Sequence, residues 1–576
     1  MSRVKLPEFI HEVIDDPRQR GILMAGSLAM FAVGLTPRVL SPGLPTAQEA
    51  LRSQPDLQNF FLLLAFAGTA TIILGGLVSD VFRRRILLVG GLAVMLVGAA
   101  IGLLVPDGPI FIGANFISIA ATGVVLAYAI GTVASTYEGI PRATALGFVY
   151  GAFGAGAAAS PAVLTLFPQL LPSDDPAVPS AFTFDTSLAY LLTAVAAGIA
   201  LWAALRWMPR IPGSLPASRR LITSIAIWSI GILAIVTGVL GLGGEAAKLF
   251  PIVLIVGGAV ALTTMTVHLK RMSKDMGSLR LDTRGLSAAL SVGIAVGFAQ
   301  AVPLMLLPVV FEYPLGYGTL FAIVAIAPFA VALLLAGPIA GILIRRFGPR
   351  GMMAGGTMAL GIANILLALT LIWIAGEVRA AFRADPDGEG AGLAAFHYLL
   401  FILPLVLVGA GFVLSTTVRT AIVFASTPRG LSASAAAINE ASVGLGSRIG
   451  IVAATSALAV AALGSAREMV IDRPLEEATA LIDEFEVALV SLGTPRFKEI
   501  YDASLAGAEP IKNAAYSVAY IDGVVVALAL SGIVGVGGAI LAWILVGRRA
   551  PIETVFDMQD ERDAEGHTPT SLPTED

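Results

Sequence analysis

The sequence has no cysteine, only four histidines and few charges, and each shortage excludes a class of function. Without cysteine there is no disulfide, no thiolate metal site and no cysteine nucleophile. The histidines at positions 11, 268, 397 and 567 are scattered and form no metal-ligand spacing. No glycine-rich phosphate loop ending in Lys-Ser or Lys-Thr occurs, which argues against an ATP-driven protein. We therefore expect no metal, no cofactor and no enzyme activity.

The shortage of charge points to a membrane protein. Charged residues make up 13% of the chain, against about 25% in ordinary soluble domains. Hydrophobic residues make up 56%, more than a soluble core can bury. They form about fourteen runs that are long enough for an α-helix to cross a bilayer. We predict an all-α integral membrane protein in contact with the lipid bilayer; the net charge of −4 gives no sign of nucleic-acid binding.

The predicted spans fall into two halves with a pair of helices between them. The N-terminal half covers 21–208, the two extra helices 217–268 and the C-terminal half 285–546, in which 464–517 forms a long outer loop. Residues 1–20 form an N-terminal segment, and 550–576 form an acidic, disordered tail. The spans are 21–41, 57–79, 86–105, 109–133, 143–168, 185–208, 221–242, 247–268, 285–311, 318–344, 351–376, 397–422, 432–464 and 518–546.

Basic residues set the orientation of these spans. If the N-terminus is inside, the clusters of Lys and Arg at 83–85, 206–220, 270–284, 345–350 and 548–549 all fall on the inner side. A shift by one helix would scatter the clusters over both faces. We therefore predict a multi-pass protein of the plasma membrane, with both termini in the cytoplasm.

Two inner loops resemble each other. GGLVSDVFRRR follows the second span, and AGILIRRFGPR follows the tenth. A similar turn in each half is typical of a duplicated transporter. The first loop resembles the signature loop of the major facilitator superfamily, Gly-x-x-x-Asp-x-x-Gly-Arg-Lys/Arg. Gly76, Asp80, Arg84 and Arg85 match, whereas Arg83 stands at the second Gly.

In that superfamily the loop forms a charge network that holds one conformation closed. The resemblance therefore implies a conformational switch at Asp80 and Arg84. The alternative is that the basic residues only set topology, which we favour for Arg345, at the Asp position of the second loop. The family fold implied here has two six-helix halves plus two extra linker helices.

The segment AAAINEASVGLGSRIG in the penultimate span narrows the resemblance. It is similar to Ala-Ala-x-Glu-Glu-Ser-x-x-Asp-Leu-Gly of the fourteen-helix drug:proton antiporter branch, the QacA/SmvA-like multidrug efflux pumps. Glu440, Leu445 and Gly446 match, whereas Asn439 and Gly444 replace the first Glu and the Asp. The branch also has an Asp in helix one, where this chain has Thr36, and an Arg in helix four, which is missing here.

The antiporter motif of helix five survives only as a glycine-rich face before Ser160 and Pro161. The family role would be to prevent leakage, and the alternative is close packing of helices through small residues. The glycines of this face are Gly147, Gly151, Gly154 and Gly156.

An ionisable residue inside a span is costly and is a functional candidate by default. Glu440 lies about nine residues into its helix and is the proton-coupling candidate, because burial favours a carboxyl group that binds and releases protons. The alternative is an ion pair between Glu440 and an Arg of another helix. Arg38, Gln300 and Arg448 are candidates to line a substrate cavity; alternatively, Arg38 extends to the outer headgroups.

These residues and the resemblance together predict a monomeric secondary transporter working by alternating access. We expect proton-coupled export of a small amphipathic or drug-like molecule, so its partners are that substrate and protons. The alternative is a membrane sensor or assembly subunit that keeps the transporter fold without pumping.

Overall fold

The computed structural model describes residues 15–50, 84–104, 108–137, 139–170, 184–209, 283–312, 314–315, 324–384, 395–426, 432–469 and 510–546, with isolated positions at 72 and between 227 and 264. Near some helix ends, including 36–50, 108–116 and 160–170, the backbone alone is described. The predicted spans 57–79 and 221–242 lie almost entirely outside these ranges, as do most of the predicted N-terminal segment 1–20, outer loop 464–517 and tail 550–576. Of the predicted span 247–268, ten positions between 252 and 264 are described, and they are helical.

The described residues are helical and contain no strand, which confirms the all-α fold. Nine of their helical segments are long and apolar enough to cross a membrane. The long helices are α2 (Pro17–Ala50), α4 (Arg84–Leu104), α5 (Gly108–Thr136), α6 (Gly139–Leu170), α7 (Phe184–Trp207), α10 (Thr283–Glu312), α12 (Ala327–Ala384), α13 (Leu399–Ala425), α14 (Ser432–Met469) and α17 (Pro510–Leu545); the short 3-10 helix η1 covers Ala395–Tyr398.

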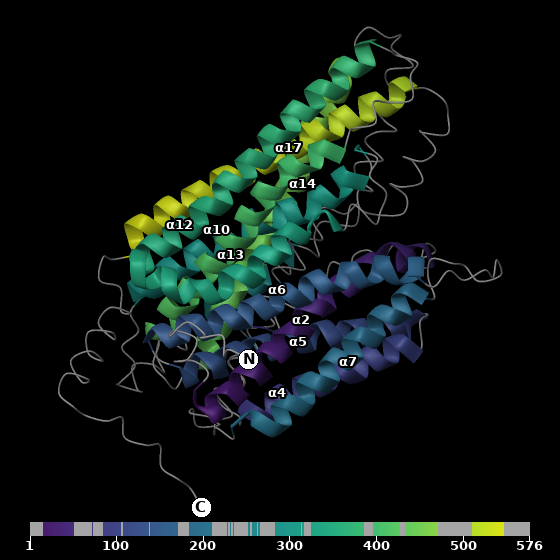
Figure 1. Cartoon of the computed structure of the whole chain (residues 1–576). Helices are drawn as coiled ribbons and strands as arrows, with labels where there is room; N and C mark the ends of the chain where they lie inside the picture. Colours follow the sequence, from purple (N-terminus) through teal and green to yellow (C-terminus); the bar gives the residue numbers. More distant parts are fainter. Residues whose placement is uncertain are drawn as a thin grey trace, which may run out of the picture.

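These helices form two groups (Figure 1). One group consists of α2, α4, α5, α6 and α7, and the other of α10, α12, α13, α14 and α17. We call them the N-terminal and C-terminal halves. They meet where α6 packs against α12 and α13, and where α5 packs against α14.

Several helix boundaries differ from the sequence prediction. The helix α17 begins at Pro510 rather than 518, inside the predicted outer loop, and α12 ends at Ala384 rather than 376. The first span was expected to end at residue 41, but α2 continues past Pro42 and Pro45 to Ala50. The predicted loop at 345–350 is a sharp break inside α12 rather than a loop. Gly348 has a φ of 69°, which glycine adopts readily because it has no Cβ. Pro349 then starts the second segment, where a missing N–H costs nothing.

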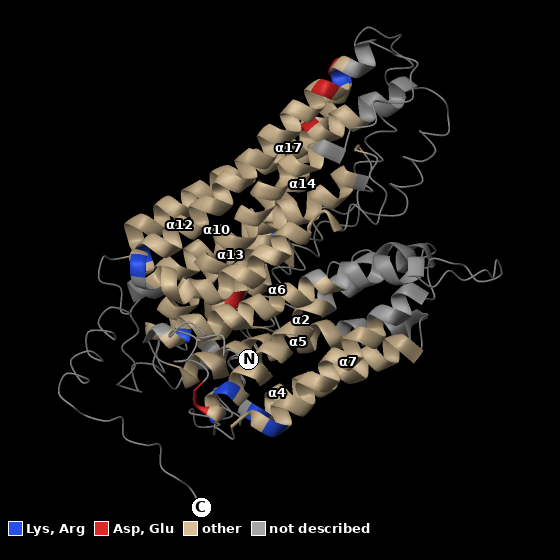
Figure 2. Ribbon diagram, viewed as in Figure 1, with Lys and Arg blue, Asp and Glu red and all other residues tan. Residues whose placement is uncertain are grey.

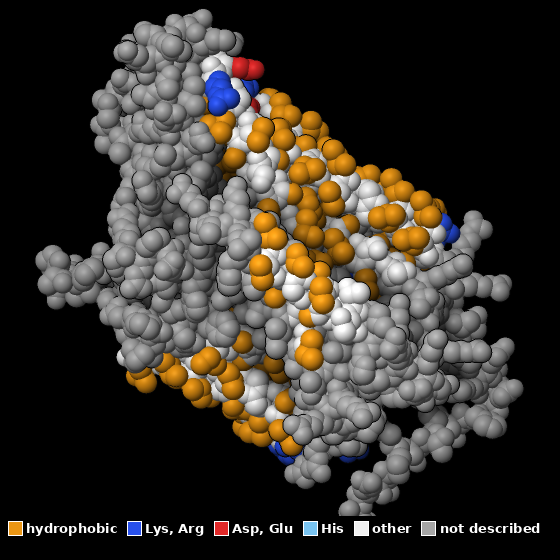
Figure 3. All heavy atoms as spheres, turned by 180° about the vertical axis from the view of Figure 1, so that it is seen from behind, with side chains coloured by type: hydrophobic (Ala, Val, Ile, Leu, Met, Phe, Trp, Pro, Cys, Tyr) orange, Lys and Arg blue, Asp and Glu red, His pale blue; other side chains and the backbone are white. Residues whose placement is uncertain are grey.

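The side chains follow the division expected of a protein in a bilayer. Large apolar side chains are exposed along the outer helix faces (Figure 3), among them Leu335, Ile372 and Trp543. Charged residues lie mostly near helix ends (Figure 2). Arg350 places its guanidinium 4.2 Å from the centre of the Trp543 ring, which joins α12 to α17 by a cation–π contact.

One end of the bundle holds the start of α4, the end of α7 and the break in α12, with Arg85, Arg206 and Arg346. We call it the basic end. The start of α6 packs closely there against the last part of the first α12 segment. A Cβ added to Gly341 of α12 would lie only 2.0 Å from the hydroxyl oxygen of Thr144 of α6.

Candidate functional site

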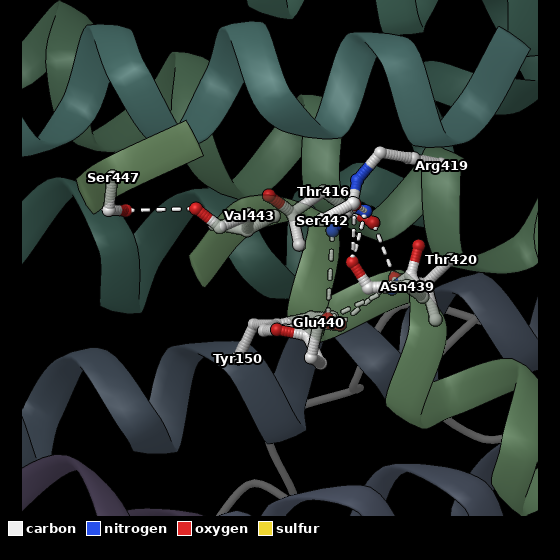
Figure 4. Close-up of polar contacts among 9 residues, drawn as sticks. All are labelled: Tyr150, Thr416, Arg419, Thr420, Asn439, Glu440, Ser442, Val443 and Ser447. Carbon is white, nitrogen blue, oxygen red and sulfur yellow. Dashed lines mark hydrogen bonds and ion pairs between the residues drawn. The ribbon is translucent and has the colours of Figure 1, made fainter. Parts of the chain in front are cut away.

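A cluster of polar side chains lies where α6 meets α13 and α14 (Figure 4). The cluster lies near the basic end of the bundle. Glu440 is eight residues after Ser432, the first residue of α14. At the helical rise this is about 12 Å along the axis. We call it the Arg419 cluster; its members are Tyr150, Arg419, Thr420, Asn439, Glu440 and Ser442.

The centre of the cluster is Arg419 on α13, whose side chain is completely buried. Its Nη1 donates hydrogen bonds to the backbone oxygen of Asn439, at 2.7 Å, and to Oγ of Ser442, at 3.0 Å. Its Nη2 lies 3.6 Å from Oε1 of Glu440. The side chain of Glu440 is only 10% exposed. A buried charge needs a partner, and these two supply it for each other.

Local helix geometry brings these groups together. Ser442 lies one turn beyond Asn439 and donates its hydroxyl proton to the Asn439 carbonyl at 2.6 Å. Both oxygens therefore face the Arg419 guanidinium. Space for the guanidinium comes from α10, where a Cβ on Gly293 would lie 2.7 Å from Nη1 of Arg419 and 2.2 Å from Oγ of Ser442. A side chain at Gly293 would displace the arginine.

The cluster also joins the two halves. The hydroxyl of Tyr150, on α6 of the N-terminal half, donates a 2.6 Å hydrogen bond to Oε1 of Glu440 and lies 2.9 Å from Oγ1 of Thr420. The side-chain amide of Asn439 donates to Oε1 of Glu440 and to Oγ1 of Thr420, at 2.9 Å each. Oε1 of Glu440 therefore accepts from one group of each half while it faces Arg419.

The predicted coupling residue Glu440 is thus found in an ion pair with an Arg of another helix, the alternative given by the sequence. Such a pair can be structural, and it can also exchange protons. The coupling role of Glu440 stays a prediction. Sequence analysis missed Arg419, which lies inside the predicted span 397–422 but only three residues from its end. Tyr150 was missed because one tyrosine among glycines and alanines gives no pattern.

Of the predicted cavity residues, Arg448 and Gln300 lie away from the cluster. Arg448 is half-buried and lies eight residues beyond Glu440 on α14, which is about 12 Å along the helix axis. Gln300 is half-buried on α10, one turn beyond Gly297, which packs against the α14 backbone at Val443. For Arg38 only the backbone is described, within α2.

The predicted switch loop is described only in part. Gly76 and Asp80 lie outside the described residues, and of Arg84 only the backbone is described. Arg85 donates a hydrogen bond to the backbone oxygen of Leu205, near the end of α7. This contact satisfies one of the free carbonyls at a helix end, within the N-terminal half. The switch role stays a prediction.

The glycines of the helix-five motif give close packing on two sides of α6. A Cβ on Gly147 would lie 2.0 Å from the carbonyl oxygen of Gly337, and one on Gly154 would lie 2.6 Å from Cβ of Leu333, both on α12. On the other side, a Cβ on Gly156 would lie 2.1 Å from the Phe31 oxygen of α2.

Gly151 is less tightly packed, with 3.5 Å between its added Cβ and the Leu334 oxygen. The side chains of Ser160 and Pro161 lie outside the described part. The close approach favours the packing role of small residues, and the anti-leak role stays a prediction.

Comparison with known proteins gives the family context. A family model described as the Major Facilitator Superfamily matches residues 26–451. The solved structure of the proton:xylose symporter XylE bound to 6-bromo-6-deoxy-D-glucose is similar, with 14% identity and a TM-score of 0.54 over 94% of this chain and 98% of that chain.

The crystal structure of the human organic anion transporter MFSD10 (TETRAN) is also similar, with 12% identity and a TM-score of 0.50. The match covers 92% of this chain and 100% of that chain. No curated protein matches the chain. At these identities the likeness to solved structures establishes the fold alone.

Proposed function

The chain belongs to the major facilitator superfamily and is a secondary transporter, and we propose that it exports a small amphipathic or drug-like molecule in exchange for protons. The Arg419 cluster supports proton coupling more than any other observation. It holds an acid and a base buried together at the contact between the two halves. Alternating access moves these halves against each other, so the contact changes in every cycle.

Glu440 is the proposed proton carrier. Its side chain is 10% exposed, and it can balance the charge of Arg419 only while it is ionised. A proton on Glu440 leaves Arg419 as a buried cation, which is costly in an apolar environment. The charge state of Glu440 is therefore linked to the stability of this conformation, and such a link is what coupling requires.

The direction of transport and the substrate class rest on the resemblance of 435–450 to the fourteen-helix drug:proton antiporters. The sugar of the XylE structure and the organic anions of MFSD10 are said of those proteins alone. We further propose that the protein works as a monomer in the plasma membrane, with both termini in the cytoplasm. Because the chain has no native cysteine, a Ser571→Cys variant tests the orientation. An impermeant thiol reagent should label it only after permeabilisation.

The proposed function is tested by substrate flux in proteoliposomes. With an acidic lumen, antiport drives substrates inward as protons leave, so a panel of lipophilic cations, neutral drugs and organic anions should include accumulated compounds. Collapse of the pH gradient should stop the accumulation. Uptake driven by an acidic exterior would indicate symport and contradict exchange. Absence of movement for every compound would favour a sensor that keeps the fold.

A further inference from the structure

The hydroxyl of Tyr150 reaches from the N-terminal half to two side chains of the C-terminal half, Thr420 and Glu440. Glu440 can change its charge by binding a proton. Tyr150 lies eleven residues after Gly139, at the basic-end part of α6. The glycine contacts of α6 with α12, at Gly147 and Gly154, lie on either side of it. In this conformation the halves are therefore packed tightly around Tyr150 at the basic end, and the side-chain bonds of Tyr150 are part of the closure.

The strength of these bonds depends on whether Glu440 is ionised. An ionised carboxylate accepts shorter and stronger hydrogen bonds than a neutral one, roughly twice as strong. In this conformation Oε1 accepts from Tyr150 at 2.6 Å and from Asn439 at 2.9 Å. A bound proton adds one positive charge and changes the net charge of the Glu440–Arg419 pair from zero to plus one. The Tyr150 bond then weakens, and the attraction to Arg419 is lost.

No other described acid compensates for that loss. Among the described residues, the charged or titratable groups that act on Glu440 are Arg419 from α13 and Tyr150 from α6. On the side of α10 the neighbour of the Arg419 guanidinium is Gly293, which has no side chain. Arg419 is 0% exposed, and its Nε and Nη2 make no hydrogen bond within the described part. After proton binding, the closed arrangement would retain a buried cation with two remaining hydrogen-bond acceptors, the Asn439 carbonyl and the Ser442 hydroxyl.

We propose that Tyr150 is the positioning residue through which the charge of Glu440 controls the closure of the two halves at the basic end. Ionised Glu440 holds the halves together through Tyr150. Proton binding releases Tyr150 and favours separation of the halves, which hydrates Arg419. This inference rests on the proposed function, because it takes Glu440 as the proton carrier. Beyond that function, Tyr150 is the residue that responds to the proton, and the response is opening of the halves at the basic end.

The test measures the separation of the halves directly. Spin labels on Leu205→Cys of α7 and Phe347→Cys of α12 report it, because both side chains are exposed near the basic end and no native cysteine interferes. In lipid nanodiscs, pulsed electron paramagnetic resonance should give a short distance in alkaline buffer and a growing long-distance population in acidic buffer. In Tyr150→Phe the ratio of closed to open should fall about tenfold in alkaline buffer, the value of a hydrogen bond to a charged group.

A double-mutant cycle then separates a charge-dependent link from a merely structural one. Glu440→Gln should be more open than wild type and insensitive to pH. If Tyr150 acts through Glu440, adding Tyr150→Phe to Glu440→Gln should change little. Tyr520→Phe, which removes the hydroxyl of a buried tyrosine on α17, is the matched control and should behave as wild type.

The outcomes distinguish the two proposals. Wild-type distances in both buffers for Tyr150→Phe overturn the role of Tyr150. The proposed function still stands in that case if Glu440→Gln abolishes pH-driven flux. Fully additive effects of the two substitutions overturn the role of Tyr150 as well. A wild-type distance distribution that ignores pH overturns the control by Glu440 charge. If wild-type flux is also insensitive to pH, the proposed proton coupling fails with it.

Discussion

Two ion pairs between an Arg and an acid are found in the described part of the C-terminal half, and they differ in nearly every physical respect. Arg419 and Glu440 lie near the basic end, with side-chain exposures of 0% and 10%, and Glu440 also bonds to the N-terminal half. Arg379 and Asp522 join the second α12 segment to α17 at the opposite end, with exposures of 40% and 25%. Asp522 also accepts a 2.5 Å hydrogen bond from Ser465 of α14.

Burial and position decide which of the two charge pairs the protein depends on. A pair in contact with solvent gains little, because water screens it and solvates either partner when the other is lost. A pair without access to solvent leaves an uncompensated charge when one partner is removed. The Arg379–Asp522 pair stays inside one half, so relative motion of the halves does not need to break it. The Arg419 cluster lies between the halves, so its contacts must change when the halves move.

The largest expected effect is that of Arg419→Leu. Removal of the guanidinium leaves Glu440 buried without a cation and should lower the stability by about 3–5 kcal/mol. Thermal unfolding of the purified protein in detergent measures the loss. The loss should shrink as the pH falls, because a neutral Glu440 needs no counterion. Arg419→Leu combined with Glu440→Gln should recover most of the stability; no recovery would show that Arg419 acts through its other contacts.

The next effect is that of Gly147→Ala, which tests the packing around the cluster. The new methyl group would lie 2.0 Å from the Gly337 oxygen, so α6 and α12 must separate. We expect the closed conformation to lose about 1–3 kcal/mol, the usual cost of overpacking, and flux to fall accordingly. Gly198→Ala on α7 is the control, because nothing lies within 4 Å of its added Cβ. Equal flux in the two variants would show that this close contact is not needed.

The smallest effect is expected at the partly exposed pair. Arg379→Gln and Asp522→Asn should each change stability by less than about 1 kcal/mol and leave flux near the wild-type rate. The same unfolding and flux measurements apply. A loss as large as that of Arg419→Leu would remove the contrast between the two pairs and indicate that the far end also opens and closes through its charges.

Much of the fold could be predicted from the sequence, because helices in lipid must satisfy their own backbone and are therefore long apolar runs. The helices α4, α5, α7, α10 and α13 begin and end within a few residues of the predicted spans. The continuation of α2 to Ala50 and the single-residue break at Gly348 could not be predicted. Hydropathy contains neither the backbone angles of a single glycine nor the continuation of a helix past a proline.

The candidate site could be predicted only in part. Glu440 is evident as an acid within an apolar run, and an Arg of another helix is one of its two predicted fates. Which Arg it meets depends on the rotation of α13 against α14. A position near the end of a span makes Arg419 look like a topology charge. The contribution of Tyr150 depends on the packing of two halves that are distant in sequence, and no local pattern shows it.

We propose that Glu440 carries the coupling proton, and this role is tested by comparing two fluxes of Glu440→Gln in the same proteoliposomes. Glutamine keeps the shape and much of the hydrogen bonding of Glu440 but cannot bind and release a proton. We predict that accumulation driven by a pH gradient is lost, while substrate exchange at equal pH on both sides continues. Accumulation at the wild-type rate, with the wild-type dependence on pH, would contradict it.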